Sequence, residues 1–465
     1  MAGDKRICSE CVSDDFLKGI INQSQEANQA CDYCCNVRPT ISMSSLAESC
    51  DDVIEHFYEV SSLTEAVVHH GWPADGADLR EVLESLLEPP TEVVDDLVEL
   101  LSEIWFDHST HEHKYGEDPS FIEKSSLAGA MSHAWRQMEE SLRHEARYLN
   151  PTAANVLEDV FGSILNDRTH QGGSVVMELG TGSENETLYR ARVFQTPGAM
   201  ETALKHPERH FGPPPPGIGS AGRMNAKGVP VFYGATKPEI AISEVRPPVG
   251  SHVVVAEFKV IRPLKVLDLR QLGTVRVEPA SSLFDPKTIE QATRRDFLRV
   301  LTRNIVKPVV PELEDHWYVV TQAIADFLAT HPKLSLDGII FPSAQHPDEN
   351  HRPGSNVILF NKASGVLYSD GRYAKRTDVR LYEYDEDSPD GRLEPSIATK
   401  DLPPHKGQNT WYWCAPERHK PALELDLDGI SIFEIEGVKY EFSSYKVHHI
   451  IDKMRNKDPE PEPDF

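Results

Sequence analysis

The chain has 465 residues, of which 39% are hydrophobic, and its formal net charge is −27. This length exceeds the usual size of a single compact core, so two or three domains are expected. The strong negative charge disfavours a protein that binds nucleic acid through the phosphate backbone, because like charges repel each other. It leaves open a local basic site for a small ligand that carries phosphate.

The sequence indicates a cytoplasmic protein without a membrane partner. It contains no run of eighteen apolar residues, and no apolar stretch follows the charged start at residues 1–6, so neither a membrane span nor a secretory signal is expected. Five of the seven cysteines lie between Cys8 and Cys35. Such a cluster suits a metal site in a reducing compartment better than a disulfide framework.

Residues 1–50 form the first predicted unit, a cysteine-rich segment. It contains two Cys-x2-Cys pairs separated by nineteen residues. Two residues between cysteines let both thiolates reach one tetrahedral ion, and the double spacing is typical of structural zinc. A structural Zn2+ is therefore predicted at Cys8, Cys11, Cys31 and Cys34. Cys35 is an alternative to Cys34, and a set of buried or reactive thiols without an ion is the alternative to a metal site.

Residues 51–175 are acidic and predict a helical domain. In 96–105 the apolar positions recur every three and four residues, and the two prolines at 89 and 90 cannot continue an earlier helix. Asn150 followed by Pro151 is typical of a helix N-cap and the first helical turn.

From 185 to 385, short β-branched runs alternate with glycine and proline, which predicts a mixed β domain. A strand at 188–194 would place Arg190 and Arg192 on one face. Thr236 and Glu239 fit a capping box for a helix at 238–245. Further strands are expected at 230–235, 253–260, 264–269, 338–341, 356–360 and 379–384, with helices at 286–306 and 316–330.

Residues 386–465 predict a C-terminal β extension with a disordered acidic tail. Strands are expected at 429–435 and 438–442, and 458–463 alternates acidic residues with proline.

The strongest functional signal is Arg223, Tyr233 and Glu244, which are ten and eleven residues apart on an expected loop, strand and helix. The planar guanidinium of arginine matches two oxygens of a pyrophosphate. A tyrosine ring can stack on nicotinamide, and a half-buried carboxylate can bind a ribose hydroxyl and stabilise an oxocarbenium-like transition state. The three residues together predict cleavage of the nicotinamide–ribose bond of NAD+.

Two more residues are candidates for the same site. Arg190 can bind the pyrophosphate from its strand, and Ser343 can bind the carboxamide or orient an arginine. Each candidate alone has a more common structural explanation, such as a strand-edge arginine or a turn serine. Their joint order favours a site in which Glu244, Arg223 and Tyr233 are catalytic and Arg190, Arg223, Tyr233 and Ser343 bind NAD+.

Five segments resemble the RES domain, a family named for an arginine, a glutamate and a serine and best known as the toxin of bacterial RES–Xre toxin–antitoxin pairs. The resemblance covers roughly 185–365, and the cysteine-rich and helical front half resembles an amino-terminal region that is classed with HEPN-like helical domains. The segments are Leu188-Tyr189-Arg190-Ala191-Arg192, Gly222-Arg223-Met224-Asn225, Val231-Phe232-Tyr233-Gly234-Ala235, Ile242-Ser243-Glu244 and Phe341-Pro342-Ser343.

The resemblance implies an α+β protein in which a zinc knuckle and a helical domain precede an ADP-ribosyltransferase-like catalytic domain at 185–385. It implies degradation of NAD+ by hydrolysis or phosphorolysis, a toxin or abortive-defence role, and an antitoxin protein as partner. Arginine-directed transferases carry a second acidic residue where this chain has Ile242, so water or phosphate is favoured as acceptor. No Rossmann fingerprint follows a strand, so NAD+ would be a substrate rather than a redox carrier.

Three other functions are alternatives to NAD+ degradation. The chain could transfer ADP-ribose to a macromolecule, or it could be a non-catalytic zinc-bearing interaction protein. A HEPN-type ribonuclease needs an arginine and a histidine four to six residues apart on one helix. Arg136 and His144 are too far apart for this, and Arg143 and His144 are too close.

Overall fold

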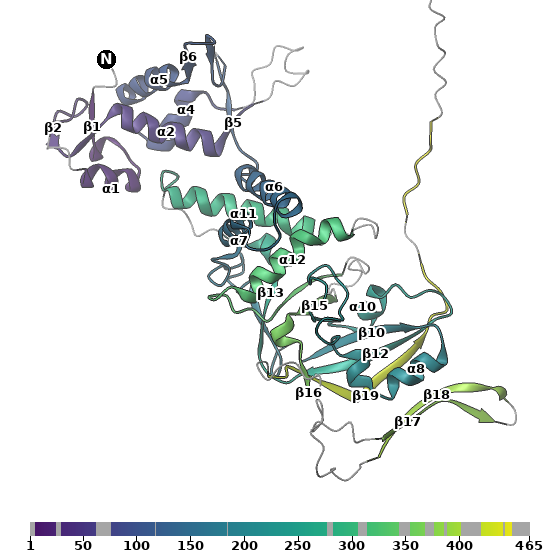
Figure 1. Ribbon diagram of the computed structural model, residues 1–465. Helices are drawn as coiled ribbons and strands as arrows, with labels where there is room; N and C mark the ends of the chain where they lie inside the picture. Colours follow the sequence, from purple (N-terminus) through teal and green to yellow (C-terminus); the bar gives the residue numbers. More distant parts are fainter. Residues whose placement is uncertain are drawn as a thin grey trace, which may run out of the picture.

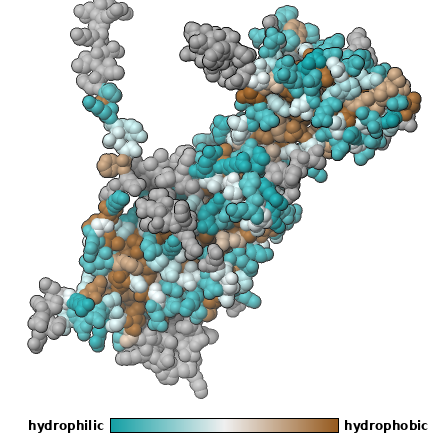
Figure 2. Space-filling view, turned by 180° about the vertical axis from the view of Figure 1, so that it is seen from behind, coloured by the Kyte–Doolittle hydropathy of each residue, from teal (hydrophilic) through white to brown (hydrophobic). Residues whose placement is uncertain are grey.

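Figure 1 shows the computed structural model, which has two lobes: a small amino-terminal lobe and a larger lobe built on a β-sheet. Figure 2 shows the same two lobes from behind, with hydrophobic side chains gathered on parts of each. The described residues are 5–24, 29–61, 76–116, 118–183, 185–276, 282–305, 314–343, 354–367, 376–385, 388–400, 420–439 and 442–448.

The amino-terminal lobe combines the cysteine-rich segment with the first helices. Its helices are η2 (Ser9–Cys11), α1 (Asp15–Gln23), α2 (Met43–Phe57), α4 (Leu79–Leu87) and α5 (Thr91–Trp105). Its paired strands are β1 (Arg6–Cys8) with β4 (Thr40–Ser42), β2 (Gln29–Ala30) with β3 (Val37–Arg38), β5 (Tyr58–Val60) with β8 (Phe121–Glu123), and β6 (Phe106–Asp107) with β7 (Glu112–His113). One buried cluster contains Cys8, Cys11 and Cys31 together with side chains of α2, α4 and α5. Residue 50 therefore does not separate two cores.

The helices α6 (Gly129–His144) and α7 (Pro151–Phe161) belong to the larger lobe. Their apolar sides share a core with α11 (Pro286–Ile305) and α12 (Glu314–Thr330), and the rings of Trp135 and Phe297 lie 5.2 Å apart. The predicted helical domain at 51–175 is thus divided between two cores. An apolar helix face must be buried, but its sequence does not say against which partner.

Several predicted helix ends are found in the structure. The Asn150 side chain accepts a hydrogen bond from the backbone of Ala153, so Asn150 caps α7 as expected. The helix α5 begins directly after Pro90. No helix in the described part of the chain has both the length and the apolar composition that a bilayer crossing requires.

Within the described residues, the larger lobe contains a nine-stranded mixed sheet in the order β16-β19-β12-β10-β11-β15-β14-β13-β9. Two of its strand pairs, β13–β14 and β16–β19, are parallel, and the others are antiparallel. The strands are β9 (Val176–Leu179), β10 (Thr187–Phe194), β11 (Phe232–Ala235), β12 (His252–Val260), β13 (Leu264–Asp268), β14 (Gly338–Pro342), β15 (Ser355–Leu359), β16 (Val366–Leu367) and β19 (Leu423–Glu434). Short 3-10 turns lie at η3 (Leu272–Thr274) and η5 (Asn361–Ala363).

Both faces of the sheet are covered, as Figure 1 shows. One face packs against α8 (Pro197–Leu204), α9 (Pro207–Phe211) and the hairpin of β17 (Arg376–Asp385) and β18 (Ser388–Lys400). The other face packs against α10 (Pro238–Glu244) and the α6, α7, α11 and α12 helices. Strand alternation assigns the side chains, so that Ile340 and Val357 face the first layer and Ile339 and Ile358 the second.

The C-terminal region differs from the prediction. The strand β19 pairs with β12 at eight positions and with β16, so it is part of the main sheet rather than an added extension. Residues 438–439 and 442 carry no strand, so the expected partner strand at 438–442 is wrong where the structure describes it. The acidic tail at 458–463 lies outside the described residues.

A short segment before α11 joins the two lobes. Phe284 is buried in the core of the amino-terminal lobe. The hydroxyl of Ser282 donates a 3.0 Å hydrogen bond to Asp14 Oδ1, the side chain that also caps α1. The helix α11 therefore begins against the amino-terminal lobe and continues into the core of the larger one.

Candidate active site

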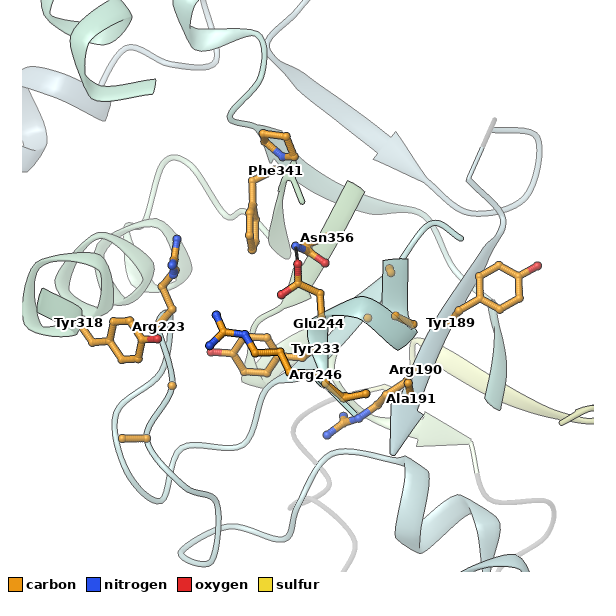
Figure 3. A pocket seen from close by; sticks show the side chains of 17 residues that line it. Tyr189, Arg190, Ala191, Arg223, Tyr233, Glu244, Arg246, Tyr318, Phe341 and Asn356 are labelled. Atoms are coloured by element: carbon orange, nitrogen blue, oxygen red, sulfur yellow. Dashed lines mark hydrogen bonds between the residues drawn. The ribbon is translucent and has the colours of Figure 1, made fainter. Parts of the chain in front are cut away.

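A pocket opens where β10 and β11 diverge. The strand β10 pairs with β12 at eight positions, but with β11 only at Tyr189 and Ala235 among the described residues. The pocket has a volume of about 470 Å³, which is within the usual range for small-molecule sites. Its lining includes Tyr189, Arg190, Gly222, Arg223, Tyr233, Glu244, Arg246, Tyr318, Phe341 and Asn356. Four residues predicted from the sequence, Arg190, Arg223, Tyr233 and Glu244, thus lie in one pocket (Figure 3).

Glu244 is the last residue of α10, a helix that starts with a proline in its first turn. Ile240 and Ala241 are buried against the sheet, and this leaves Glu244 exposed at the pocket. Ser343 Oγ and Asn356 Nδ2 both donate hydrogen bonds to Glu244 Oε1, at 2.7 and 2.8 Å. These bonds fix the carboxylate through one oxygen and direct the other toward the pocket (Figure 3). Orienting Glu244 is a role for Ser343 that the sequence did not suggest.

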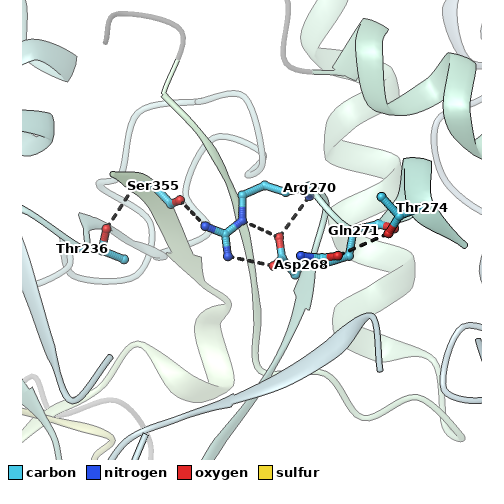
Figure 4. A network of polar contacts seen from close by, with 6 residues as sticks. All are labelled: Thr236, Asp268, Arg270, Gln271, Thr274 and Ser355. Carbon is cyan, nitrogen blue, oxygen red and sulfur yellow. Dashed lines mark hydrogen bonds and ion pairs between the residues drawn. The ribbon is translucent and has the colours of Figure 1, made fainter. Parts of the chain in front are cut away.

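A buried polar network holds the segments that carry Glu244 and Asn356 (Figure 4). Arg270 binds both carboxylate oxygens of Asp268, at 2.8 and 2.7 Å, and donates to Ser355 Oγ at 2.8 Å. The hydrogen bonds to Asp268 raise the pKa of the Arg270 guanidinium above its usual range. Ser355 in turn donates its backbone N–H to Thr236 Oγ1 at 3.0 Å and lies next to Asn356. The network therefore ties the start of β15 to Thr236, two residues before α10 begins.

The predicted capping box of α10 is wrong. The N-cap of this helix is Lys237, one residue later than expected, and it makes no side-chain capping bond. The hydroxyl of Thr236 is used instead by Ser355 on the neighbouring strand. A capping box requires both side chains to bond at the helix start, and a tertiary contact has taken one of them.

The loop of Gly222, Arg223, Met224 and Asn225 is held by Tyr233. The phenol of Tyr233 donates to Asn225 Oδ1 at 2.8 Å and accepts from the Met224 N–H at 3.1 Å. The Gly222 N–H also donates to the carbonyl of Asn225 at 3.0 Å. Burial raises the pKa of Tyr233 to about 12, so the phenol keeps its proton at neutral pH. Its ring forms a wall of the pocket while its hydroxyl fixes the loop.

Arg223 is anchored from the helical layer. Its Nη1 donates to the carbonyl of Ile305 at the end of α11, at 3.1 Å. Its guanidinium carbon lies 5.9 Å from the centroid of the Tyr318 ring, within the range of a cation–π contact. Thr321 and Gln322 of α12 donate to the loop carbonyls of Arg223 and Gly222.

Replacing Gly222 with alanine tests whether Tyr233 holds this loop. A Cβ at this position would lie 2.6 Å from the Tyr233 hydroxyl and 2.7 Å from Asn225 Oδ1, the two ends of one hydrogen bond. We expect a loss of about 1–3 kcal/mol in the free energy of unfolding, because the loop must shift and break this bond. Thermal unfolding measures the effect. Gly198→Ala is the control, because nothing lies within 4 Å of its Cβ position, and equal shifts for the two variants would contradict the steric argument.

Arg190 lies on the face of β10 opposite to Tyr189 and Ala191, and it lines the pocket between β10 and β11. Its guanidinium carbon lies 5.3 Å from the Phe232 ring, and Nη1 has neither solvent contact nor a hydrogen-bond partner among the described residues. Burial lowers the pKa of Arg190 to about 10, so the side chain stays charged at neutral pH. A buried cation without an anion is costly, so this position favours a negatively charged ligand.

Four pocket residues were not proposed as site residues from the sequence: Arg246, Tyr318, Asn356 and Phe341, which was named only within a segment of the resemblance. Arg246 is exposed, follows Glu244 by two residues, and has a left-handed backbone with φ of +46°. A basic residue two positions after Glu244 was a usable signal for it. The other three come from segments more than seventy residues further along the chain, and the sequence alone does not show that they meet here.

The four predicted metal ligands also come together. The sulfur atoms of Cys8, Cys11, Cys31 and Cys34 all lie within 4.8 Å of one another, with a Cys8–Cys34 distance of 3.5 Å and Cys8–Cys11 and Cys11–Cys31 distances of 3.8 Å. Tetrahedral zinc with Zn–S bonds of about 2.3 Å places its sulfurs about 3.8 Å apart. The four cysteines can therefore hold one metal ion.

The cysteines differ in their surroundings, both within the cluster of four and outside it. A hydrogen bond from the backbone of Asn36 lowers the pKa of Cys34 to about 7, whereas burial raises the pKa of Cys11. Cys35 is exposed and outside the cluster, and Cys50 is buried within α2.

A comparison with known protein families matches part of the larger lobe. Residues 187–381 match the family model of the RES domain, and this part of the chain is a RES domain, as the resemblance predicted. Searches of curated proteins and of solved structures found no match. The match begins at residue 187, so the HEPN-like resemblance of the front half stays a prediction.

Proposed function

We propose that this protein degrades NAD+ by cleaving its nicotinamide–ribose bond, and that its catalytic domain is related in fold to ADP-ribosyltransferases. The RES domain suggests an NAD-related enzyme of the toxin class. The observation that carries the proposal is the Glu244 carboxylate, fixed by Ser343 and Asn356 in a pocket that also presents Arg190 and Arg223.

Each residue has a role in this reaction. Arg190 and Arg223 bind the pyrophosphate, and the ring of Tyr233 packs against nicotinamide. When the bond between ribose C1′ and nicotinamide breaks, its electron pair moves to the pyridinium nitrogen, so nicotinamide leaves as a neutral molecule. Glu244 binds a ribose hydroxyl and stabilises the positive charge that develops on the ribose ring. Water or phosphate then forms the new bond to C1′ and loses its proton.

A small acceptor fits the acidic residues of the pocket. Glu244 is the one carboxylate among the residues that line it in the described part of the chain. Ile242, at the position of a second acid in arginine-directed transferases, packs with the apolar side of α10. We therefore favour hydrolysis or phosphorolysis over transfer to a macromolecule. We also propose a toxin or abortive-defence role in the cytoplasm, with an antitoxin protein as partner and a structural Zn2+.

The experiment incubates the intact protein with NAD+ and an RNA and measures nicotinamide release, with and without inorganic phosphate. We expect nicotinamide together with ADP-ribose from hydrolysis, or ADP-ribose 1-phosphate when phosphate is the acceptor. Intact NAD+ with cleaved RNA would favour the HEPN-type ribonuclease. Bound but uncleaved NAD+ would favour a non-catalytic interaction protein.

Asn356→Ala tests the orientation of the carboxylate. The substitution removes one of two donors to Glu244 Oε1, so we expect kcat for nicotinamide release to fall about 10- to 100-fold. KM for NAD+ should change less, because Asn356 acts on Glu244 rather than on the pyrophosphate. Asn166→Ala removes an exposed asparagine that is not among the residues lining the pocket, and it serves as control. An unchanged kcat in Asn356→Ala would refute this role.

A further inference from the structure

A row of basic side chains continues from the pocket along the sheet. Arg190 and Arg192 lie on the same face of β10, because side chains alternate along a strand. The helix α9 packs beside this face, with the rings of Phe194 and Phe211 6.3 Å apart. His210 precedes Phe211, and besides its burial it lies near enough to Arg192, His206 and Arg209 for their charges to lower its pKa. The side chains of His206 and Arg209 are exposed. We call Arg190, Arg192 and His210 the basic row.

Among the described residues, no carboxylate pairs with the basic row, although the chain has 74 acidic and 47 basic residues. Burial alone lowers the pKa of Arg192. Burial and the neighbouring Arg192, Arg209 and His206 lower the pKa of His210. No acidic group in the described part of the chain opposes either shift. Two partly buried arginines elsewhere in this lobe do have carboxylate partners. Arg294 binds both oxygens of Asp167 at 2.9 and 2.7 Å, and Arg270 binds Asp268.

The like charges of Arg190 and Arg192, placed together on a half-buried face, destabilise the protein when no anion is bound. A phosphate group would offset this cost, because it accepts several charge-assisted hydrogen bonds at once. The missing carboxylates also keep the basic row open to such a ligand. The buried, unpartnered Nη1 of Arg190 marks the end of the row that meets the pocket.

The position of the basic row indicates which part of a bound dinucleotide it would contact. Figure 3 shows that β10 continues past Arg190 in the direction away from Glu244. Arg192 lies about 7 Å further along the strand than Arg190, since each residue of a strand adds about 3.4 Å. If Glu244 faces the ribose of nicotinamide and Arg190 the pyrophosphate, Arg192 and His210 face the adenosine half.

We propose that Arg192 and His210 form a subsite for a phosphate monoester on the adenosine half of the dinucleotide. The protein therefore prefers a nicotinamide dinucleotide that carries a third phosphate, such as NADP+, over NAD+. This inference rests on the proposed function, because it takes the orientation of the dinucleotide from the cleavage site at Glu244.

The test measures binding to full-length protein with the Glu244→Gln substitution, which is expected to slow turnover strongly. NAD+ and NADP+ are titrated by calorimetry in phosphate-free buffer. We expect NADP+ to bind about 10-fold more tightly than NAD+, as for one charge-assisted contact. Adding Arg192→Gln or His210→Asn should bring the ratio close to one and leave the affinity for NAD+ within about two-fold. Two separate variants guard against a folding defect, and thermal unfolding without ligand checks both.

Lys205→Gln is the matched control, because it also removes one positive charge from this side of the lobe. Lys205 directly precedes His206 in the chain and is not part of the basic row. It forms an ion pair with Glu201 at 2.7 Å. The ratio of affinities should not change in this variant. A change equal to that of Arg192→Gln would show a general charge effect and overturn the subsite.

The remaining outcomes separate the inference from the proposed function. If NAD+ binds but NADP+ binds no more tightly, the subsite is refuted and the proposed function stands. If neither dinucleotide binds and wild type releases no nicotinamide, both fail. Titration of inorganic phosphate tests whether the basic row binds free phosphate instead of the third phosphate of a dinucleotide. If phosphate alone binds in a manner that Arg192→Gln abolishes while NADP+ has no advantage, the basic row binds free phosphate and the proposal is wrong.

Discussion

Glu244→Gln is expected to lower kcat for nicotinamide release by about 100- to 1,000-fold, because the amide cannot stabilise the positive charge of the transition state. The substitution is nearly isosteric, and the glutamine oxygen can still accept the hydrogen bonds of Ser343 and Asn356. The fold and the KM for NAD+ should therefore change little. Initial rates over a range of NAD+ concentrations, together with thermal unfolding, separate loss of chemistry from loss of structure.

Glu239→Gln is the control for this prediction. Glu239 lies in the first turn of the same helix, is exposed, and is not among the residues that line the pocket. The Glu239→Gln substitution removes the same charge from α10 but changes no residue of the pocket lining, so wild-type rates are expected. If Glu244→Gln kept more than about a tenth of the activity, the carboxylate would not be the principal source of transition-state stabilisation.

Removing the metal ion is expected to unfold the amino-terminal lobe. Three of the four cysteines are buried in the cluster that also contains the apolar sides of α2, α4 and α5, so the ion would lie within the core of this lobe. Structural zinc sites contribute about 10 kcal/mol or more to folding. A strong chelator, or Cys31→Ser, should produce a separate unfolding transition at lower temperature and a loss of helical circular dichroism.

Cys35→Ser is the matched control for Cys31→Ser, because Cys35 is exposed and outside the sulfur cluster. Metal analysis should find one zinc ion per chain in wild type and in Cys35→Ser, and a loss of zinc in Cys31→Ser. A metal-free wild type with the same thermal stability would favour buried thiols without an ion.

The two lobes are connected in a way that links these predictions. The helix α11 follows Phe284, which is buried in the amino-terminal lobe, and it ends at Ile305, whose carbonyl binds Arg223. Loss of the metal would therefore disturb the end of a helix whose other end positions a pocket arginine. Reduced nicotinamide release on chelation, smaller than the effect of Glu244→Gln, is the expected consequence.

Local structure was predictable from the sequence because short-range physics decides it. Asn150 and Pro151 start α7 because an N-cap side chain and a first-turn proline satisfy the helix end wherever the helix lies. The packing partners of each helix and strand were harder to predict. The apolar faces of α6 and α7 pack against α11 and α12, more than a hundred residues later, and the helical region alone did not indicate these partners.

The same distinction applies to the site. Arg223, Tyr233 and Glu244 lie within 22 residues, so their relation was visible as a spacing, and the structure places them in one pocket. Asn356 was missed because its contact with Glu244 spans 112 residues and arises from the pairing of β15 with β11. Thr236 was misassigned because its hydroxyl bonds to Ser355 on that same strand.

A crystal structure of the zinc-loaded Glu244→Gln protein with NAD+ would show how the dinucleotide binds. We predict the pyrophosphate at Arg190 and Arg223, the nicotinamide ring against Tyr233, and its ribose beside residue 244. A dinucleotide bound outside the opening between β10 and β11, or turned so that adenine lies at residue 244, would contradict this prediction.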